Sequence, residues 1–412
     1  MKKSGYADLP LHYGKVPVWL YERMAKLGEA VLESIIIQYG KAEVLRRISD
    51  PFWFQALGCA MGMDWHSSGI TTSVMGALKK AATRIGHEYG LFICGGRGKH
   101  SLKTPEELLL IAGKTGLDGD RLVKASRLSA KIDNTAVQDG YQLYLHAFIL
   151  TDEGDWAVVQ QGMNEKNRMA RRYHWHSPSL RSFVEEPHAG VCGVNHGLIL
   201  NLTDKEAAPA RAGILSLFHQ KKEVLSEMRK LSMPLRHDVK GEDVDLKKLG
   251  AILALSENQS IRDFESVLLL KGIGPRALQS LTLVSEVIHG SPSRFRDPAR
   301  FSFAHGGKDG HPFPVPLKVY DETISALKNS VERSKLGYSD KQRAIESLHR
   351  MAVRIEKDFK PNNRFDDLLK QERENSWRYG GRTVFGKAQP PRKTNGAQLE
   401  LFNEFQSHKD RG

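Results

Sequence analysis

The chain has 412 residues, with 61 Lys and Arg against 48 Asp and Glu, so its formal net charge is +13 at pH 7. This length allows roughly two or three domains, and a hydrophobic content of 40% can support real cores. The charge excess favours a polyanionic partner, with nucleic acid as the default. No stretch approaches the ~20 apolar residues of a membrane helix, and the N-terminus lacks the apolar run of a signal peptide.

The three cysteines, Cys59, Cys94 and Cys192, lie far apart and form no CxxC pair. This spacing indicates neither a zinc ribbon nor a disulfide framework. It suits a reducing compartment, so we expect a cytoplasmic protein.

The first 203 residues are expected to form a mixed α+β domain. Apolar residues at helical spacing predict helices over residues 15–39, 41–49, 67–80 and 104–130. The segments 142–150 and 156–160 read as strands, and the TDEGD between them predicts a β-hairpin. A further β run is expected at 191–201.

From residue 204 the pattern becomes helical, and an all-helical domain is expected over 204–360. Residues 361–412 are rich in Gly, Pro, Asn, Gln and charge. Such a composition cannot bury enough apolar surface to order itself, so a flexible tail is expected there.

Residues 264–289 of the helical part resemble the helix–hairpin–helix of DNA polymerases, repair nucleases and glycosylases. A helix is expected to end at Lys271, Gly272-Ile273-Gly274 to form a tight turn, and a second helix to begin at Pro275. Two glycines let a phosphate approach the backbone, and the second helix directs its N–H groups at the anion. The expected DNA contacts here are Lys271, Gly272, Ile273, Gly274 and Arg276.

The same resemblance raises the possibility of a base-excision glycosylase. In the lyase-type members a lysine lies two residues beyond the second glycine, but this chain has Arg276, which cannot form a Schiff base. Asp297 is near the place of their catalytic aspartate. A glycosylase based on Asp297 is therefore one alternative.

Polar residues gather around the predicted β-hairpin, as a nuclease would need. Nucleases use carboxylates to hold a metal, and a base or a metal-bound hydroxide to attack the phosphate. The order of residues is similar to restriction-type nuclease cores, except that Gln160-Gln161-Gly162 replaces their Glu-x-Lys. The expected catalytic residues are Asp133, Asp139, Gln160, Lys131 and His174.

A divalent metal is expected as the cofactor, Mg²⁺ or Mn²⁺ with Zn²⁺ as an alternative. Asp139 would hold it with Gln160. Alternatively, Asp64 and His66 of the string MDWHSSG would converge on it with Asp133, Asp139, His174 or His188. The same residue types also cap helices, close turns and satisfy core groups, so both interpretations stay open.

Further DNA contacts are expected where basic side chains lie beside aromatic rings or in polar loops. Arg171 and Arg172 belong to EKNRMARRYHWHS, a composition that suits nucleic acid. His305 and Lys308 belong to a Gly/Pro/His-rich loop over 290–317. The string from Gly95 to His100 could hold a phosphate, but it lacks the Gly-Lys-Ser/Thr ending of a nucleotide-binding loop.

The tail contains the short apolar cluster QLELF. It resembles the peptide by which bacterial polymerases and repair proteins bind the DNA sliding clamp. In that pattern Gln398 hydrogen-bonds at the pocket rim, Leu401 and Phe402 fill the pocket, and Leu399 belongs to the same motif. The alternative is an amphipathic turn that docks on its own protein.

Six strings together resemble an uncharacterised bacterial and archaeal family, domain of unknown function 763. They are GYADLP (5–10), DWHSSG (64–69), DGYQLY (139–144), VQQGMN (159–164), RRYHW (171–175) and FAHGGKDG (303–310). This resemblance implies a family but no function.

The sequence therefore predicts a DNA-repair protein that binds DNA, with a metal-dependent nuclease as the leading hypothesis. A non-catalytic DNA-binding adaptor tethered to the sliding clamp is the main alternative, and the missing Glu-x-Lys favours it.

Overall fold

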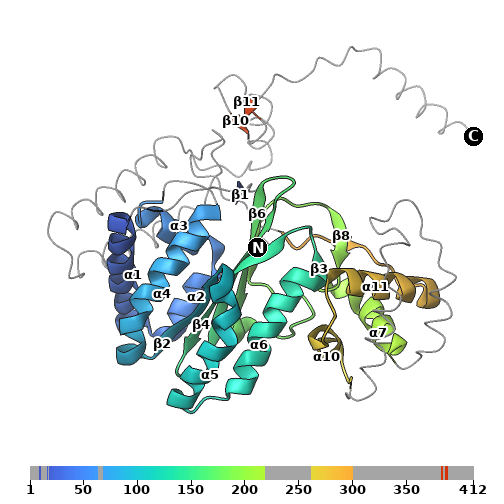
Figure 1. Ribbon diagram of the computed structural model, residues 1–412, viewed down its shortest axis with the longest axis horizontal. Helices are drawn as coiled ribbons and strands as arrows, with labels where there is room; N and C mark the ends of the chain where they lie inside the picture. Colours follow the sequence, from blue (N-terminus) through green and yellow to red (C-terminus); the bar gives the residue numbers. More distant parts are fainter. Residues whose placement is uncertain are drawn as a thin grey trace, which may run out of the picture. The chain divides into compact units, whose positions relative to one another are not determined.

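The structure is a computed structural model that describes residues 9–10, 16, 18–63, 68–218, 261–299, 382–383 and 386–387. The chain divides into two compact units, one of residues 1–303 and 315–357 and one of 304–314 and 358–412. In the second unit the described residues form a small antiparallel pair, β10 (Arg382–Thr383) and β11 (Gly386–Lys387). The remaining described helices and strands belong to the first unit (Figure 1).

The first unit is built on an antiparallel sheet with the strand order β1-β6-β5-β4-β2, and β7 also pairs with β6. The strands are β1 (Leu9–Pro10), β2 (Leu91–Arg97), β4 (Gln142–Thr151), β5 (Trp156–Asn164), β6 (Met169–His176) and β7 (Gly190–Cys192). β4 and β5 form the predicted hairpin, with Phe148 opposite Val158, so this prediction is confirmed.

Four helices cover one face of the sheet: α1 (Val18–Tyr39), α2 (Lys41–Ser49), α3 (Pro51–Ala60) and α4 (Ser68–Tyr89). Asp50 caps α3 by accepting hydrogen bonds from the N–H groups of Phe52 and Trp53, which is the favoured helix start. Leu32 and Leu78 of these helices share a core with Ile149 of β4.

The opposite face is covered by α5 (Thr104–Thr115), α6 (Gly119–Lys131), α7 (Ala208–Leu217), α10 (Phe264–Leu269) and α11 (Pro275–His289). Leu122 of α6 and Leu278 of α11 lie in one core with Phe148 and Trp175 of the sheet. A small second sheet pairs β3 (Val137–Gln138), β8 (Leu198–Asn201) and β9 (Phe295–Arg296).

The α+β class expected from the sequence is confirmed: helices lie on both faces of an antiparallel sheet (Figure 1). The two helices predicted within residues 264–289 share their core with residues before 203, while the domain boundary at 203 itself stays a prediction. None of the helices within the described ranges has the length and apolar character that crossing a membrane requires.

Three segments differ from their predicted structure. Gly95 to Arg97 are the end of β2 rather than a loop, and Gly98–Lys103 form a 3-10 turn. Residues 169–176 are strand β6, paired on both edges and buried, rather than a basic surface segment. The expected β run at 191–201 is interrupted and contributes to β7 and β8 separately.

The backbone conformation and the close neighbours of Gly95 require a glycine. A substitution at this position therefore tests whether Gly95 lies in the sheet. Its φ is +82°, and a Cβ there would lie under 3.0 Å from the His146 carbonyl oxygen and the Thr104 hydroxyl. We expect Gly95→Ala to lower the free energy of unfolding by about 3 kcal/mol, from backbone strain and overpacking. Denaturant unfolding measures this loss.

Gly98→Ala is the matched control, because Gly98 has a φ of +58° but a Cβ at this position would meet nothing within 4 Å. It should lose only about 1 kcal/mol. Equal losses at both positions would contradict the close packing of β2 against β4.

Candidate functional site: an exposed hairpin turn beside a buried polar cluster

A tight turn joins α10 to α11 at Leu270 to Gly274, where the sequence predicts a turn between two helices. Ile273 donates its N–H to the Leu270 carbonyl (3.2 Å) and is buried in the core, which fixes the turn. Gly272 has a φ of +98°, a conformation that favours glycine. Lys271 and Arg276 are exposed on either side.

The turn is anchored to the sheet layer through its carbonyl groups. Lys131, at the end of α6, donates from Nζ to the Ile273 carbonyl. Gln138 donates from Nε2 to the Pro275 carbonyl over 2.8 Å. Partial burial lowers the pKa of Lys131. Lys131, expected to be catalytic, therefore holds the hairpin in place.

Gly274 is glycine for no reason that the fold supplies. Its φ of −130° and ψ of −176° are extended backbone that any residue adopts. A Cβ there would meet nothing within 4 Å. The missing side chain leaves the backbone of the turn open to solvent at the N-terminus of α11.

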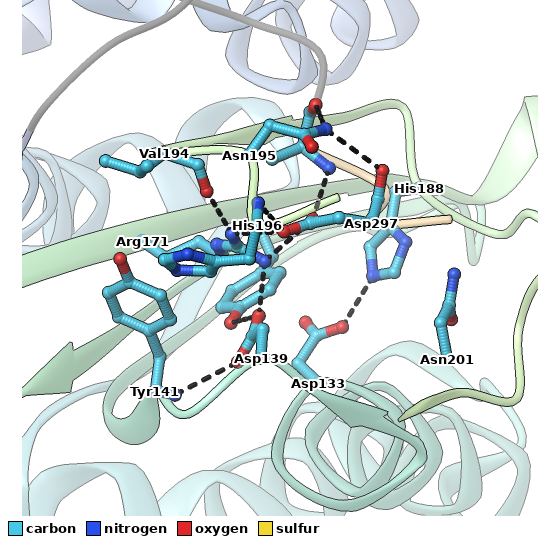
Figure 2. Close-up of polar contacts among 12 residues, drawn as sticks. Asp133, Asp139, Tyr141, Arg171, His188, Val194, Asn195, His196, Asn201 and Asp297 are labelled. Atoms are coloured by element: carbon cyan, nitrogen blue, oxygen red, sulfur yellow. Dashed lines mark hydrogen bonds and ion pairs between the residues drawn. The ribbon is translucent and has the colours of Figure 1, made fainter. Parts of the chain in front are cut away.

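A buried ion triad lies on the sheet face that carries α6 (Figure 2). Arg171 of β6 donates from Nη1 to Asp139 (2.8 Å) and pairs with both oxygens of Asp297 (2.9 and 2.8 Å). Asp139 also accepts from the Tyr173 hydroxyl (2.6 Å) and the Tyr141 N–H (3.0 Å). Burial raises the pKa of Asp139, and Arg171 opposes that shift.

Asp297 is likewise occupied. Its Oδ2 accepts from the His196 N–H (2.8 Å) and its Oδ1 from the Ala299 N–H (2.9 Å). With Arg171 on both oxygens, the carboxylate is held as a structural ion pair with 5% of the residue exposed. This arrangement does not suit the free catalytic aspartate of the glycosylase alternative.

Asp133 is the centre of a second network and is fully buried. It lies in a π-helical turn, Ile132–Ala136, after α6. Its Oδ2 accepts from Gln160 Nε2 (2.6 Å) and Trp175 Nε1 (2.9 Å), and its Oδ1 lies 2.5 Å from His188 Nε2. Burial raises the pKa of Asp133, and His188 opposes that shift.

The network continues from Gln160 into the sheet. Gln160 Oε1 lies 2.9 Å from His146 Nδ1, and His146 Nε2 lies 2.9 Å from the Ser126 hydroxyl. Because Gln160 donates to Asp133, its oxygen must accept from His146, and His146 must accept from Ser126. Burial lowers the pKa of His146 to about 4, which agrees with a neutral ring.

The other ring nitrogen of His188 has no hydrogen-bond partner among the described residues. The ring packs edge-on against Trp175 with centroids 4.8 Å apart, and its side chain is 5% exposed. A buried carboxylate on one nitrogen and an open second nitrogen is the arrangement of an oriented general base.

The predicted DNA contacts Arg171 and Arg172 are wrong for a surface role, because both are fully buried. Arg172 faces the other side of the sheet, where Nε donates to His174 Nε2 (2.9 Å) and the guanidinium lies 4.7 Å from the Phe54 ring centre. Both faces of β6 are covered by helices, so neither base reaches solvent.

His174, expected to be catalytic, lies on that same opposite face. Its Nδ1 is 3.0 Å from the Ile48 carbonyl, and burial keeps its pKa well below the usual range. The sheet separates it from Asp133 and Asp139, so the three do not form one site. His174 is a neutral core residue that accepts a hydrogen bond from Arg172.

The expected metal does not fit Asp139, since both its oxygens already accept hydrogen bonds from protein donors. In the portion of the chain that the structure describes, no three His, Cys, Asp or Glu residues are arranged to hold a metal ion. Several predicted residues lie outside the described residues: Asp64, His66, His305, Lys308, Gln398, Leu399, Leu401 and Phe402.

The sequence indicates His188 only as a possible metal ligand, and it predicts neither its contact with Asp133 nor the contacts of His146 and Ser126. Asp133 and His188 are 55 positions apart, and no local spacing connects them. The sequence does contain one signal. Gln160 and His146 are polar residues within predicted strands and lie on one face, where a polar side chain needs buried partners.

The ion triad yields a prediction for Arg171→Met. Removing the guanidinium leaves Asp139 and Asp297 as uncompensated buried carboxylates. We expect a loss of about 3–5 kcal/mol in the free energy of unfolding at pH 7. A raised folded-state pKa penalises folding above that pKa, so the loss should shrink as pH falls towards 5.

Arg46→Met is the control, because Arg46 forms an exposed pair with Glu43 and should cost less than about 1 kcal/mol at either pH. Denaturant unfolding at both pH values measures the difference. A loss at Arg171 as small as that at Arg46, or one that grows at low pH, would contradict the triad.

Comparisons with known proteins give a family and no relative of known function. The family described as "Protein of unknown function (DUF763)" matches residues 5–315. A search of curated proteins and a search of solved structures each found no match. The matched region includes the sheet, the buried polar cluster and the hairpin turn, and the chain therefore belongs to the DUF763 family.

Proposed function

We propose that the chain binds the phosphate backbone of DNA through the turn Lys271 to Arg276. The observation that carries this proposal is Gly274, whose missing side chain neither its backbone conformation nor its neighbours require. A bare backbone at a helix N-terminus is what close approach of a phosphate needs. Exposed Lys271 and Arg276 add positive charge beside it.

Such contacts bind backbone and not sequence. The proposal therefore describes a protein that grips DNA of any sequence, in keeping with a role in DNA repair. The sliding clamp remains the proposed partner of residues 398–402, so the DNA-binding adaptor is the function we favour.

Gly274→Val tests the hairpin. The valine should be tolerated by the fold, because its backbone conformation is ordinary and the space around it is empty. It should block the phosphate and weaken binding to duplex DNA by about tenfold, equally on unrelated sequences. Fluorescence anisotropy with labelled duplexes measures the affinity.

Gly113→Val is the matched control, since Gly113 is an exposed glycine of α5 that also has nothing within 4 Å of a Cβ. It should bind DNA as the unmodified protein does. Unchanged affinity in Gly274→Val, or a loss restricted to one sequence, would contradict a backbone contact at the turn.

A nuclease is the second candidate, and the Asp133–His188 pair is the observation that favours it. His188 could take a proton from an attacking water while Asp133 orients the ring. This proposal differs from the expected metal site because it relies on neither Asp139 nor His174.

His188→Gln should lower any cleavage of labelled single-stranded, duplex, flap or abasic DNA by about a hundredfold or more, with DNA affinity unchanged. His176→Gln is the control, as His176 contacts Ser179 away from Asp133. Reactions should be run with and without Mg²⁺, Mn²⁺ and Zn²⁺. If the unmodified protein binds these substrates but cuts none of them, the nuclease candidate is wrong and the adaptor stands.

A further inference from the structure

Helix α6 has two faces of opposite character. Leu122, Val123 and Leu128 are buried beside the sheet. The outward positions Arg121, Lys124 and Arg127 are exposed and recur every three residues, and Lys131 follows four residues later. This spacing places the four bases along one side of the helix.

The basic side of α6 lies against the hairpin. Lys124 pairs with Glu265 of α10 over 3.1 Å, and Lys131 bonds the Ile273 carbonyl in the turn. Arg127 lies between these two contacts along the helix. Figure 1 shows α6 on the same side of the sheet as α10 and α11, and the contact of Lys131 with Ile273 places the end of α6 at the turn.

The charges along this side do not cancel. After Asp120, α6 carries no acidic residue up to Lys131. Glu265 neutralises Lys124, but neither Arg121 nor Arg127 forms an ion pair with any described residue. Together with Lys271 and Arg276, which are exposed on the turn, they form a track of positive charge.

We propose that the exposed basic side of α6, Arg121 and Arg127, is a second contact for the backbone of duplex DNA bound at the hairpin. This inference rests on the proposed DNA binding by the turn. From Arg121 to Lys131 the helix rises about 15 Å, which corresponds to about four base pairs at about 3.4 Å each. The footprint then extends beyond the turn itself.

The composition of α6 favours duplex over single-stranded DNA and over a protein partner. The helix contains no aromatic residue, whereas single-strand sites use aromatic rings to stack bases. Protein interfaces are enriched in aromatic anchors and depleted in lysine at their centre. A side with only arginine and lysine beside a backbone-binding turn suits a polyanionic rod.

The double variant Arg121→Gln/Arg127→Gln of the full chain tests this contact. Its affinity should be measured for a labelled duplex, and for a single strand of the same sequence, over a series of NaCl concentrations. For the duplex, the slope of log K against log salt should fall by about 1.8 in magnitude, because two phosphate contacts are lost. Affinity at moderate salt should drop by about tenfold or more.

Two further variants make the result specific. Lys26→Gln/Arg84→Gln removes the same formal charge from α1 and α4 on the other face of the sheet and should leave the slope unchanged. Arg121→Lys/Arg127→Lys keeps the charge and should retain the slope, which also excludes misfolding as the cause.

The outcomes separate this inference from the proposed function. If Gly274→Val weakens binding while the α6 double variant retains both slope and affinity, the hairpin stands and the second contact is wrong. An equal loss in the α1/α4 control would also overturn it, since net charge alone would then explain the effect. Both proposals fail if the unmodified chain binds neither the duplex nor the single strand, and if the Arg121 and Arg127 variants change binding only to an acidic protein.

Discussion

The placement of Arg171 between two buried carboxylates constrains the rest of this unit. Asp139 precedes β4, Arg171 lies in β6, and Asp297 follows β9, so three distant segments must be in place together. Desolvation offsets much of the attraction in a buried ion pair, but leaving one partner alone costs several kcal/mol. The triad therefore acts through specificity of arrangement more than through net stability. Because Asp297 follows the hairpin in the chain, it fixes where the polypeptide returns to the sheet after α11.

Helices α10 and α11 are thus packed in the same unit as the sheet, and the exposed turn between them is directly connected to the buried polar cluster. Lys131 holds the turn, and Asp133 follows two residues later in the π-helical segment. A π turn accommodates an extra residue and often occurs at functional sites.

Helices α1, α2 and the β4–β5 hairpin could be predicted from the sequence because their apolar periodicity is strong. Strand β6 could not, because both its faces are buried and polar residues occupy both. Such a strand shows no alternation of apolar and polar residues, and its basic composition indicates a surface instead. The exposed turn at Gly272 to Arg276 was identified by its glycines and proline. Only part of the buried cluster could be predicted. The sequence indicates Asp133, Asp139 and Gln160 as site residues, but not their partners, because these come from elements far along the chain.

The polar rows of the sheet explain why β6 has its unusual composition. Tyr173, Gln160 and His146 are opposite one another across β6, β5 and β4 and face the α6 side. In the next row Arg172 pairs with Gln161 and faces the α4 side, where Gln161 meets Thr71. A slip of one residue would put Arg172 towards Asp139 and Arg171 towards apolar and neutral groups, leaving buried charges unpaired on both faces. The bases of β6 are therefore committed to defining the strand register. The basic side chains accessible to a polyanion are those that are not buried in the core. Helix α6 and the turn between α10 and α11 carry such side chains next to one another.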